Sequence, residues 1–250
     1  MVISKAPCPH FTQVPSVPER SNLTLPTSID GPPDNSGVWT RQLGRRMRSH
    51  LGLKTIGIAL FMWIFFAAYF HLLRNPAFPL TQMPLTALDR AIPFQPGALA
   101  AYVSLWLYVG IAPNLLLSLR QLIEYGLWVG GLCVAGLACF YFVPTAVPPV
   151  ALNLDLSQHP AFALLQGADA TGNACPSLHV ATAMFSAFWI DRLLREVGAP
   201  NVLRVLNGGW FLLIVHSTLA IKQHVVLDVL AGGALGCVFA LASLRWRSLH

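Results

Sequence analysis

Six long runs of mostly apolar residues constrain the fold of this chain more than any other feature of its sequence. They lie near residues 55–73, 97–119, 125–143, 176–194, 205–221 and 225–244. A helix needs about 20 mostly apolar residues to cross a bilayer, and each run has roughly that length. The last two runs joined as one helix would reach about 60 Å, twice the hydrocarbon thickness, so we expect a hairpin at Lys222-Gln223-His224. The sequence therefore predicts an all-α, polytopic membrane protein, a bundle of six transmembrane helices.

The first 50 residues have a different character. They are rich in Pro and Ser, show no helical or alternating period, and end in a basic cluster made of Arg41, Arg45, Arg46 and Arg48. Such a composition is typical of disordered segments. We therefore expect a disordered cytoplasmic tail over residues 1–50 and a membrane domain over residues 51–247.

The distribution of charge predicts the orientation in the membrane. The chain is 55% hydrophobic and only 10% charged, and its net charge is +6. If the tail lies inside, all of the 16 Lys and Arg residues except Arg74, Arg90 and Lys222 fall on the inner side, as the positive-inside rule requires. Topology thus explains the net charge, nucleic-acid binding is excluded, and both termini are expected to be cytoplasmic.

Two polar clusters are expected at the outer ends of their helices, where they can share one pocket. The first runs from Asn173 to His179 and the second from Ser217 to Asp228. Ionisable groups at membrane depth are costly, which makes them functional candidates. From Pro176 to the next charged residues there are about 15 residues, or roughly 22 Å of helix, so the pocket is expected at the depth of a lipid headgroup.

Within these clusters the spacing suggests catalytic roles. His224 and Asp228 are four residues apart, hence on one helical face, where the carboxylate can orient the imidazole and make it a better nucleophile. Ser177 and His179 fall in the expected first turn of the fourth helix, with Pro176 at its start. The free N–H groups and the dipole of such a turn suit an anion such as phosphate.

Other residues have plainer interpretations. His216 is expected to be a packed or hydrogen-bonded histidine, and Cys175 a small apolar filler. Gly126-x3-Gly130 and Gly232-x3-Gly236 fit either a homodimer face or packing inside one chain, and packing inside the chain is favoured. The sequence shows no metal-ligand spacing of His, Cys or Glu, so we expect neither a metal nor a cofactor.

The two clusters together resemble a known family. Pro176-Ser177-Leu178-His179, followed by Ser217-x6-His224-x3-Asp228, is similar to the second and third signatures of the type 2 phosphatidic acid phosphatase and haloperoxidase superfamily. Leu178 is similar to the inositol-phosphorylceramide-synthase-like branch, as is the run Asp89-x3-Pro93-Phe94-x-Pro96-x5-Tyr102. The resemblance covers about residues 50–245.

The resemblance implies a role for each matching residue. His224 would be the nucleophile that forms a phosphohistidine, Asp228 its orienting partner, and His179 the general acid for the leaving group. Ser177 would hold a phosphoryl oxygen, and Ser217 and Asn173 are expected to add substrate contacts. Phosphohistidine chemistry of this kind needs no metal.

The sequence departs from the family pattern in its cations. Thr218 stands where the third signature usually has Arg, and the first signature, Lys-x6-Arg-Pro, finds only Tyr141 and Pro148-Pro149. We expect Lys222 to supply part of the phosphate clamp, with Arg90 or Arg74 as the next candidates. The departures shift weight from a phosphatase toward a phosphotransferase, and also toward an inactive member.

These observations predict a membrane enzyme that transfers the phosphoryl group of a lipid phosphate, or a phosphorylated headgroup, to water or an alcohol. Its site would face outward, into the periplasm if the protein is bacterial. The alternatives are an inositol-phosphorylceramide-synthase-like transferase and, in another class, a non-catalytic membrane protein that retains the fold. The expected partners are a phosphorylated lipid and the bilayer, and a homodimer is left open.

Overall fold

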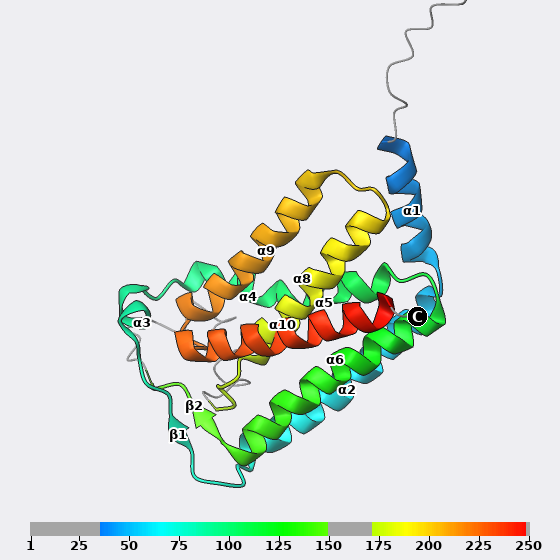
Figure 1. The fold of residues 1–250 in the computed structure, drawn as a ribbon. Helices are drawn as coiled ribbons and strands as arrows, with labels where there is room; N and C mark the ends of the chain where they lie inside the picture. Colours follow the sequence, from blue (N-terminus) through cyan, green and yellow to red (C-terminus); the bar gives the residue numbers. More distant parts are fainter. Residues whose placement is uncertain (1–35, 150–171, 249–250) are drawn as a thin grey trace, which may run out of the picture. The chain divides into compact units, whose positions relative to one another are not determined.

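The computed structural model describes residues 36–149 and 172–248, which belong to one compact unit. Most of the expected tail, and the middle of the loop expected at 145–175, lie outside the described residues. The helices are α1 (Ser36–Arg48), α2 (Leu51–Arg74), α3 (Ala87–Ala91), α4 (Leu99–Val103), α5 (Leu105–Asn114), α6 (Leu119–Phe142), α8 (Leu178–Glu196), α9 (Asn201–Ala220) and α10 (Val226–Ser248) (Figure 1). A 3-10 helix η1 (Pro96–Ala98) and the two strands β1 (Thr81–Gln82) and β2 (Thr145–Ala146) complete the elements.

The predicted all-α fold is confirmed, and each apolar run corresponds to helix. The second run is divided into η1, α4 and α5, and the other five are the single helices α2, α6, α8, α9 and α10. Among the described residues, five segments are long and apolar enough to cross a membrane, and α8 is the run that falls short. Eleven of the 19 residues of α8 are buried, so protein rather than lipid surrounds this helix and it tolerates polar side chains. The chain is a membrane protein.

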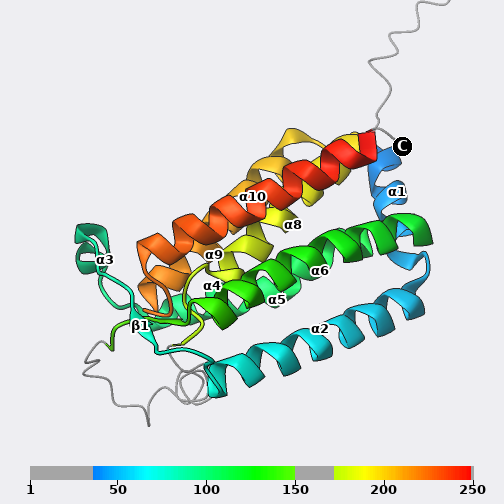
Figure 2. The same ribbon diagram turned by 60° about the horizontal axis from the view of Figure 1, so that its bottom comes forward.

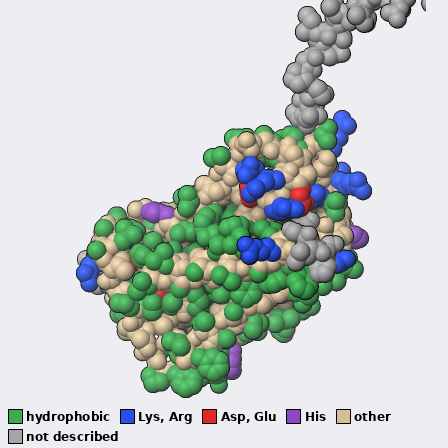
Figure 3. All heavy atoms as spheres, in the orientation of Figure 1, with side chains coloured by type: hydrophobic (Ala, Val, Ile, Leu, Met, Phe, Trp, Pro, Cys, Tyr) green, Lys and Arg blue, Asp and Glu red, His purple; other side chains and the backbone are tan. Residues whose placement is uncertain are grey.

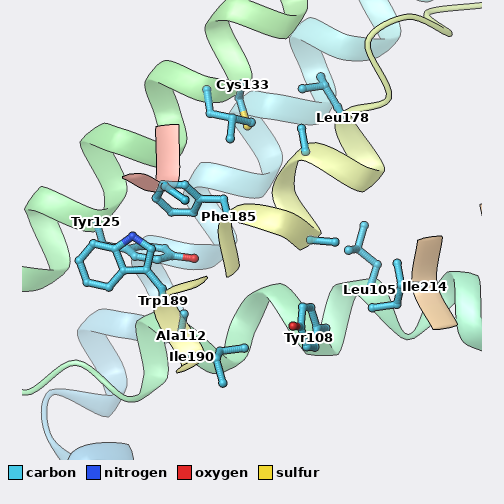
Figure 4. Close-up of a cluster of buried hydrophobic side chains, with 14 of the residues drawn as sticks. Leu105, Tyr108, Ala112, Tyr125, Cys133, Leu178, Phe185, Trp189, Ile190 and Ile214 are labelled. Carbon is cyan, nitrogen blue, oxygen red and sulfur yellow. The ribbon is translucent and has the colours of Figure 1, made fainter. Parts of the chain in front are cut away.

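Helix α8 is the centre of the bundle. It packs against α5, α6, α9 and α10, and its side chains Phe185 and Trp189 lie in a core shared with Tyr108, Tyr125 and Ile214 (Figure 4). The indole Nε1 of Trp189 donates a hydrogen bond to Ser243 Oγ on α10 at 3.0 Å. The helix therefore holds any group at its first turn in a rigid frame.

The close contact between α10 and α8 depends on glycine. A Cβ atom at Gly232 would overlap the backbone oxygen of Ser177, and one at Gly236 would overlap that of Ala181. Gly232-x3-Gly236 thus serves packing inside the chain, the favoured interpretation. Gly126 has nothing within 4 Å of an added Cβ, so a homodimer through Gly126-x3-Gly130 stays a prediction.

One end of the bundle carries α1 and the basic residues. Residues 36–48, expected to be part of a disordered tail, form the helix α1, because Arg46 pairs with Glu196 at 3.6 Å and donates to the carbonyl of Leu115 at 3.3 Å. The ammonium of Lys54 is buried beneath and donates to the carbonyls of Arg46 and Asn114, at 2.7 and 2.8 Å, and to a serine hydroxyl. Figure 3 shows Lys and Arg gathered at this α1 end, next to a mostly hydrophobic surface.

The opposite end carries residues 75–98, between α2 and α4, and the described residues 143–149 and 172–177 that follow α6 and precede α8 (Figure 1). Strands β1 and β2 pair in parallel, with Thr81 opposite Thr145 and Gln82 opposite Ala146. Ala146 also bridges Gly172. We call this the β1 end, and the first turns of α8 and α10 lie there (Figures 1 and 2).

Helix α2 stands at the side of the bundle. It runs beside α6 (Figure 2) and also contacts α5. None of its most apolar 18-residue window is buried. Because α2 is not packed into the core, a cleft remains between it and the other helices.

Candidate active site

The residues from both polar clusters meet at the β1 end. His224 lies in the hairpin between α9 and α10, and its backbone N–H donates to the carbonyl of Thr218 at 3.2 Å. Its imidazole Nδ1 lies 3.6 Å from Oδ2 of Asp228, one turn further along. The His224 side chain is 11% exposed and that of Asp228 is fully buried. The spacing of four therefore places the carboxylate beside the imidazole, as the sequence predicts.

The carboxylate of Asp228 is held by the backbone. Its Oδ2 accepts a hydrogen bond from the N–H of Val225 at 3.0 Å, while Oδ1 has no hydrogen-bond partner within the described residues, and neither has Nδ1 of His224. Buried polar atoms without partners are costly, so a small shift that brings Nδ1 onto the carboxylate is favourable. Since Nδ1 faces Asp228, Nε2 is the nitrogen left for an attack on substrate.

His179 is the second residue of α8 and is fixed by Tyr102 of α4. Its ring stacks on that of Tyr102 at 4.0 Å between centroids with an interplanar angle of 13°, and its Nε2 lies 3.1 Å from the Tyr102 carbonyl oxygen. A carbonyl oxygen only accepts, so Nε2 carries the hydrogen of this bond. The nitrogen available to a substrate is therefore Nδ1.

Both histidines line one cleft of about 640 Å³, bounded by α2, α4, α5, α6 and the start of α8. Asn173 also lines it, with a backbone φ of 53° and with its amide donating to the carbonyl of Tyr69 at 3.1 Å. Apart from these groups the walls are mostly apolar, and they include Phe61, Phe65, Phe66, Trp106 and Val109. The cleft reaches from the histidines to Lys54 at the α1 end.

The other three candidate residues, Ser177, Ser217 and Lys222, do not line the cleft. Ser177 is fully buried and caps α8, since its Oγ accepts from the N–H of Val180 at 3.3 Å. The helix therefore begins at Leu178, and Pro176, expected in its first turn, precedes the cap. The Ser177 N–H donates to the carbonyl of Asp228 at 3.0 Å, which joins the starts of α8 and α10.

The side chains of Ser217 and Lys222 donate hydrogen bonds to backbone carbonyls of the protein. Ser217 is fully buried and donates to the carbonyl of Ile214 at 2.6 Å. The Lys222 ammonium donates to the carbonyls of Asp89 and Ile92, at 2.9 and 2.5 Å. Ser177, Ser217 and Lys222 are not among the residues that line the cleft, so a phosphate clamp that includes Lys222 stays a prediction without support from these contacts.

Two further cations, Arg74 and Lys54, and the histidine His216 lie away from the two cleft histidines. The Arg74 guanidinium lies 5.6 Å from the Phe70 ring centroid. Lys54 is the one Lys or Arg side chain lining the described cleft, at the end away from the histidines. His216 is exposed on α9, so the expectation of a packed histidine is wrong: the residue lies on the outer face of its helix.

Cys175 adjoins the site but is poorly suited to attack a substrate. Its backbone N–H donates to Thr145 Oγ1 at 2.8 Å. Burial, and to a smaller degree the negative charge of Asp228 and the nearby Cys139, raises the pKa of the Cys175 thiol to about 11. The thiolate is the reactive form, so the thiol is inert near neutral pH. Within the described residues, no group of three or more His, Cys, Asp or Glu side chains is placed to hold a metal.

Sequence reasoning missed how two residues of the segment between α2 and α5 contact the site. Asp89 accepts a hydrogen bond from the N–H of Val226 at 2.8 Å, and Tyr102 holds His179. Both belong to the run Asp89-x3-Pro93-Phe94-x-Pro96-x5-Tyr102 that resembles a family pattern. The resemblance includes both residues, but a sequence pattern cannot predict their contacts with the surroundings of histidines that lie more than 70 residues further along the chain.

Comparison with known proteins gives one match. The family model described as the PAP2 superfamily matches residues 125–250, a range that begins in α6 and includes both histidines. No curated protein and no solved structure matches the chain.

Proposed function

The chain belongs to the PAP2 superfamily, and from this membership we propose that it is a lipid-phosphate phosphatase or phosphotransferase that acts through a phosphohistidine on His224. The observation that carries the proposal is that His179 and His224 line the same apolar cleft. Two histidines supply a nucleophile and an acid, and the apolar walls suit the hydrocarbon part of a lipid. Superfamily membership supports the reaction class, and the cleft supports the substrate class.

The proposed reaction has two displacements. Nε2 of His224 attacks phosphorus, the N–P bond forms and the P–O bond to the leaving group breaks. Nδ1 of protonated His179 gives the leaving oxygen its proton, while the Asp228 carboxylate compensates the positive charge that develops on the His224 ring. In the second step His179 takes a proton from water or an alcohol, whose oxygen attacks phosphorus and releases His224.

A transferase is the second candidate, and one observation favours it. Within the described residues, no Lys or Arg side chain lines the histidine end of the cleft, whereas the family's phosphatase signatures carry arginines. This favours the inositol-phosphorylceramide-synthase-like branch, in which a lipid alcohol or polyol takes the phosphorylated group. A phosphate-release assay on a panel of lipid phosphates, with and without such acceptors, separates the two: a phosphatase releases phosphate in water alone, and a transferase forms product only with the acceptor.

The intermediate is tested with labelled substrate and quenching in alkaline detergent, on three histidine variants. Phosphohistidine is acid-labile and base-stable, so we expect such a label in wild type and none in His224→Ala. His179→Ala loses only the proton donor, a contribution of about a hundred- to ten-thousandfold, and is expected to retain labelling when the leaving group is already acidic, as in an aryl phosphate. His216→Ala, exposed on the same bundle, is the matched control and should label like wild type.

Three results would contradict this proposal in different ways. A label on His224→Ala would mean that the histidine roles are reversed. Turnover without any label in wild type would point to direct transfer. A folded wild type that neither labels nor turns over any lipid phosphate would favour the non-catalytic alternative.

A further inference from the structure

We propose that the segment Thr86–Tyr102 positions both catalytic histidines and that Asp89 is its key positioning residue. This inference rests on the function proposed above. Asp89 itself does not line the cleft, and the proposed reaction does not use its carboxylate.

Asp89 holds the start of α10. It is 8% exposed, and its Oδ1 accepts a hydrogen bond from the N–H of Val226, the first residue of α10, at 2.8 Å. Its Oδ2 accepts from both the backbone N–H and the hydroxyl of Thr86, each at 2.7 Å. Val226 lies two residues after His224 and two before Asp228. Asp89 is thus an N-terminal cap for α10 supplied by a residue 137 positions earlier in the chain, and its charge suits that helix end.

Lys222, two residues before His224, attaches the other side of the hairpin to the same segment. Its backbone has a φ of 61°, and its ammonium donates to the carbonyls of Asp89 and Ile92. The N–H of Gln95 donates to the carbonyl of Ala220 at 2.9 Å. Residues on both sides of His224 are therefore attached to one short stretch of the segment Thr86–Tyr102, which limits how far the hairpin can move.

The same segment ends at the second histidine. Tyr102 stacks on the ring of His179, and its carbonyl faces Nε2 of that ring. Phe94, Ala98 and Leu99 pack against Tyr102 and Ile221, close to the hairpin. One segment therefore contacts the surroundings of the nucleophile through Asp89 and of the acid through Tyr102, so the relative placement of the two histidines depends on it.

The contacts of Asp89 separate a positioning role from a catalytic one. Each of its oxygens already accepts hydrogen bonds from the protein, and it does not line the cleft. Loss of the side chain should therefore leave substrate binding unchanged while the attacking nitrogen is displaced. A displacement of about 1 Å can reduce a rate about a hundredfold, so Asp89→Ala should lower kcat by about that factor with KM unchanged.

The experiment compares three variants, each assayed per mole of folded protein. Asp89→Asn keeps a carbonyl oxygen for the Val226 N–H and should recover most of the kcat that Asp89→Ala loses. Asp191→Ala is the matched control: it removes an acidic side chain that pairs with Arg195 and Arg204 at the α1 end, so it tests for loss of stability without displacement of His224. Its kcat should equal that of wild type.

A second measurement does not depend on turnover. Carbethoxylation of His224 by diethyl pyrocarbonate, followed by mass spectrometry, should be faster in Asp89→Ala because the released hairpin exposes the imidazole. If kcat and the modification rate are both unchanged in Asp89→Ala, or if Asp89→Asn is as slow as Asp89→Ala, the positioning role is overturned. If wild type turns over no lipid phosphate, the proposed function fails, and the modification rate still decides whether Asp89 restrains His224.

Discussion

At the scale of single residues, the pair His224 and Asp228 contains buried polar atoms without hydrogen-bond partners, an arrangement that costs folding free energy. Asp228 is fully buried, yet one of its oxygens and the facing Nδ1 have no hydrogen-bond partner within the described residues. An isolated buried carboxylate is strongly disfavoured, and its natural compensation is a positive charge on the neighbouring ring. In the proposed reaction that charge arises when His224 bonds to phosphorus, so we expect the arrangement to favour the phosphohistidine over the resting enzyme.

Cys175 gives a prediction at the same scale, in the pH dependence of its alkylation. Its pKa is raised to about 11, mainly by burial, so the thiol stays protonated at neutral pH and the thiolate fraction increases about tenfold per pH unit below the pKa. We expect the alkylation rate of Cys175, followed by mass spectrometry, to continue rising beyond pH 9. A cysteine introduced at the exposed Gln82 is the control and should level off earlier. A plateau for Cys175 near the control's would contradict the burial described here.

At the scale of elements, the contact between α8 and α10 determines the site. Asp228 and Ser177 are joined by a backbone hydrogen bond, and this is possible because Gly232 allows the two helices to approach closely. Asp228 on α10 and His179 on α8 therefore share one helix interface.

This interface predicts opposite effects for two glycine substitutions. In Gly232→Ala the added methyl group meets the Ser177 backbone, so the helices must separate, and overpacking of this kind costs about 1–3 kcal/mol. In Gly209→Ala, on the exposed face of α9 and away from the cleft, the methyl group meets nothing within 4 Å, and the better helix propensity of Ala should stabilise by about 0.5–1 kcal/mol. Thermal unfolding in detergent measures both, and activity should fall only in Gly232→Ala. Equal stability of the two variants would exclude the close approach.

At the scale of the whole molecule, the positive-inside rule predicts which end faces the cytoplasm. The α1 end carries most of the described basic residues (Figure 3) and the β1 end carries the histidines. We therefore predict that the active site faces outward.

Labelling from outside intact cells tests this topology. In a background without native cysteines, a cysteine at Gln82, exposed at the β1 end, should react with a membrane-impermeant thiol reagent. A cysteine at Gln42, exposed on α1, should react only after the membrane is opened. The reverse pattern would place the site on the cytoplasmic side.

The sequence by itself determined the features that depend on local composition and period. Apolar runs of bilayer length predicted the six helical segments, because hydrocarbon tolerates helix and excludes charge along the whole run. The spacing of His224 and Asp228 predicted their contact, because a helix brings residues four apart together. Residues 36–48 escaped this reasoning, since their helix α1 is held by Arg46 and Lys54 through contacts with distant segments.

Only the tertiary structure decided where polar side chains point and what they bind. Ser177 caps its own helix, Lys222 turns toward Asp89 and Ile92, and Tyr102 stacks on His179. His216 lies on the outer face of α9, although its sequence neighbours suggested packing. The contacts of Lys222 and Tyr102 join residues 77 to 133 positions apart, and the position of His216 depends on which face of α9 meets a neighbour. The spacing of residues along the sequence does not predict these long-range contacts, because they depend on how whole helices pack against one another.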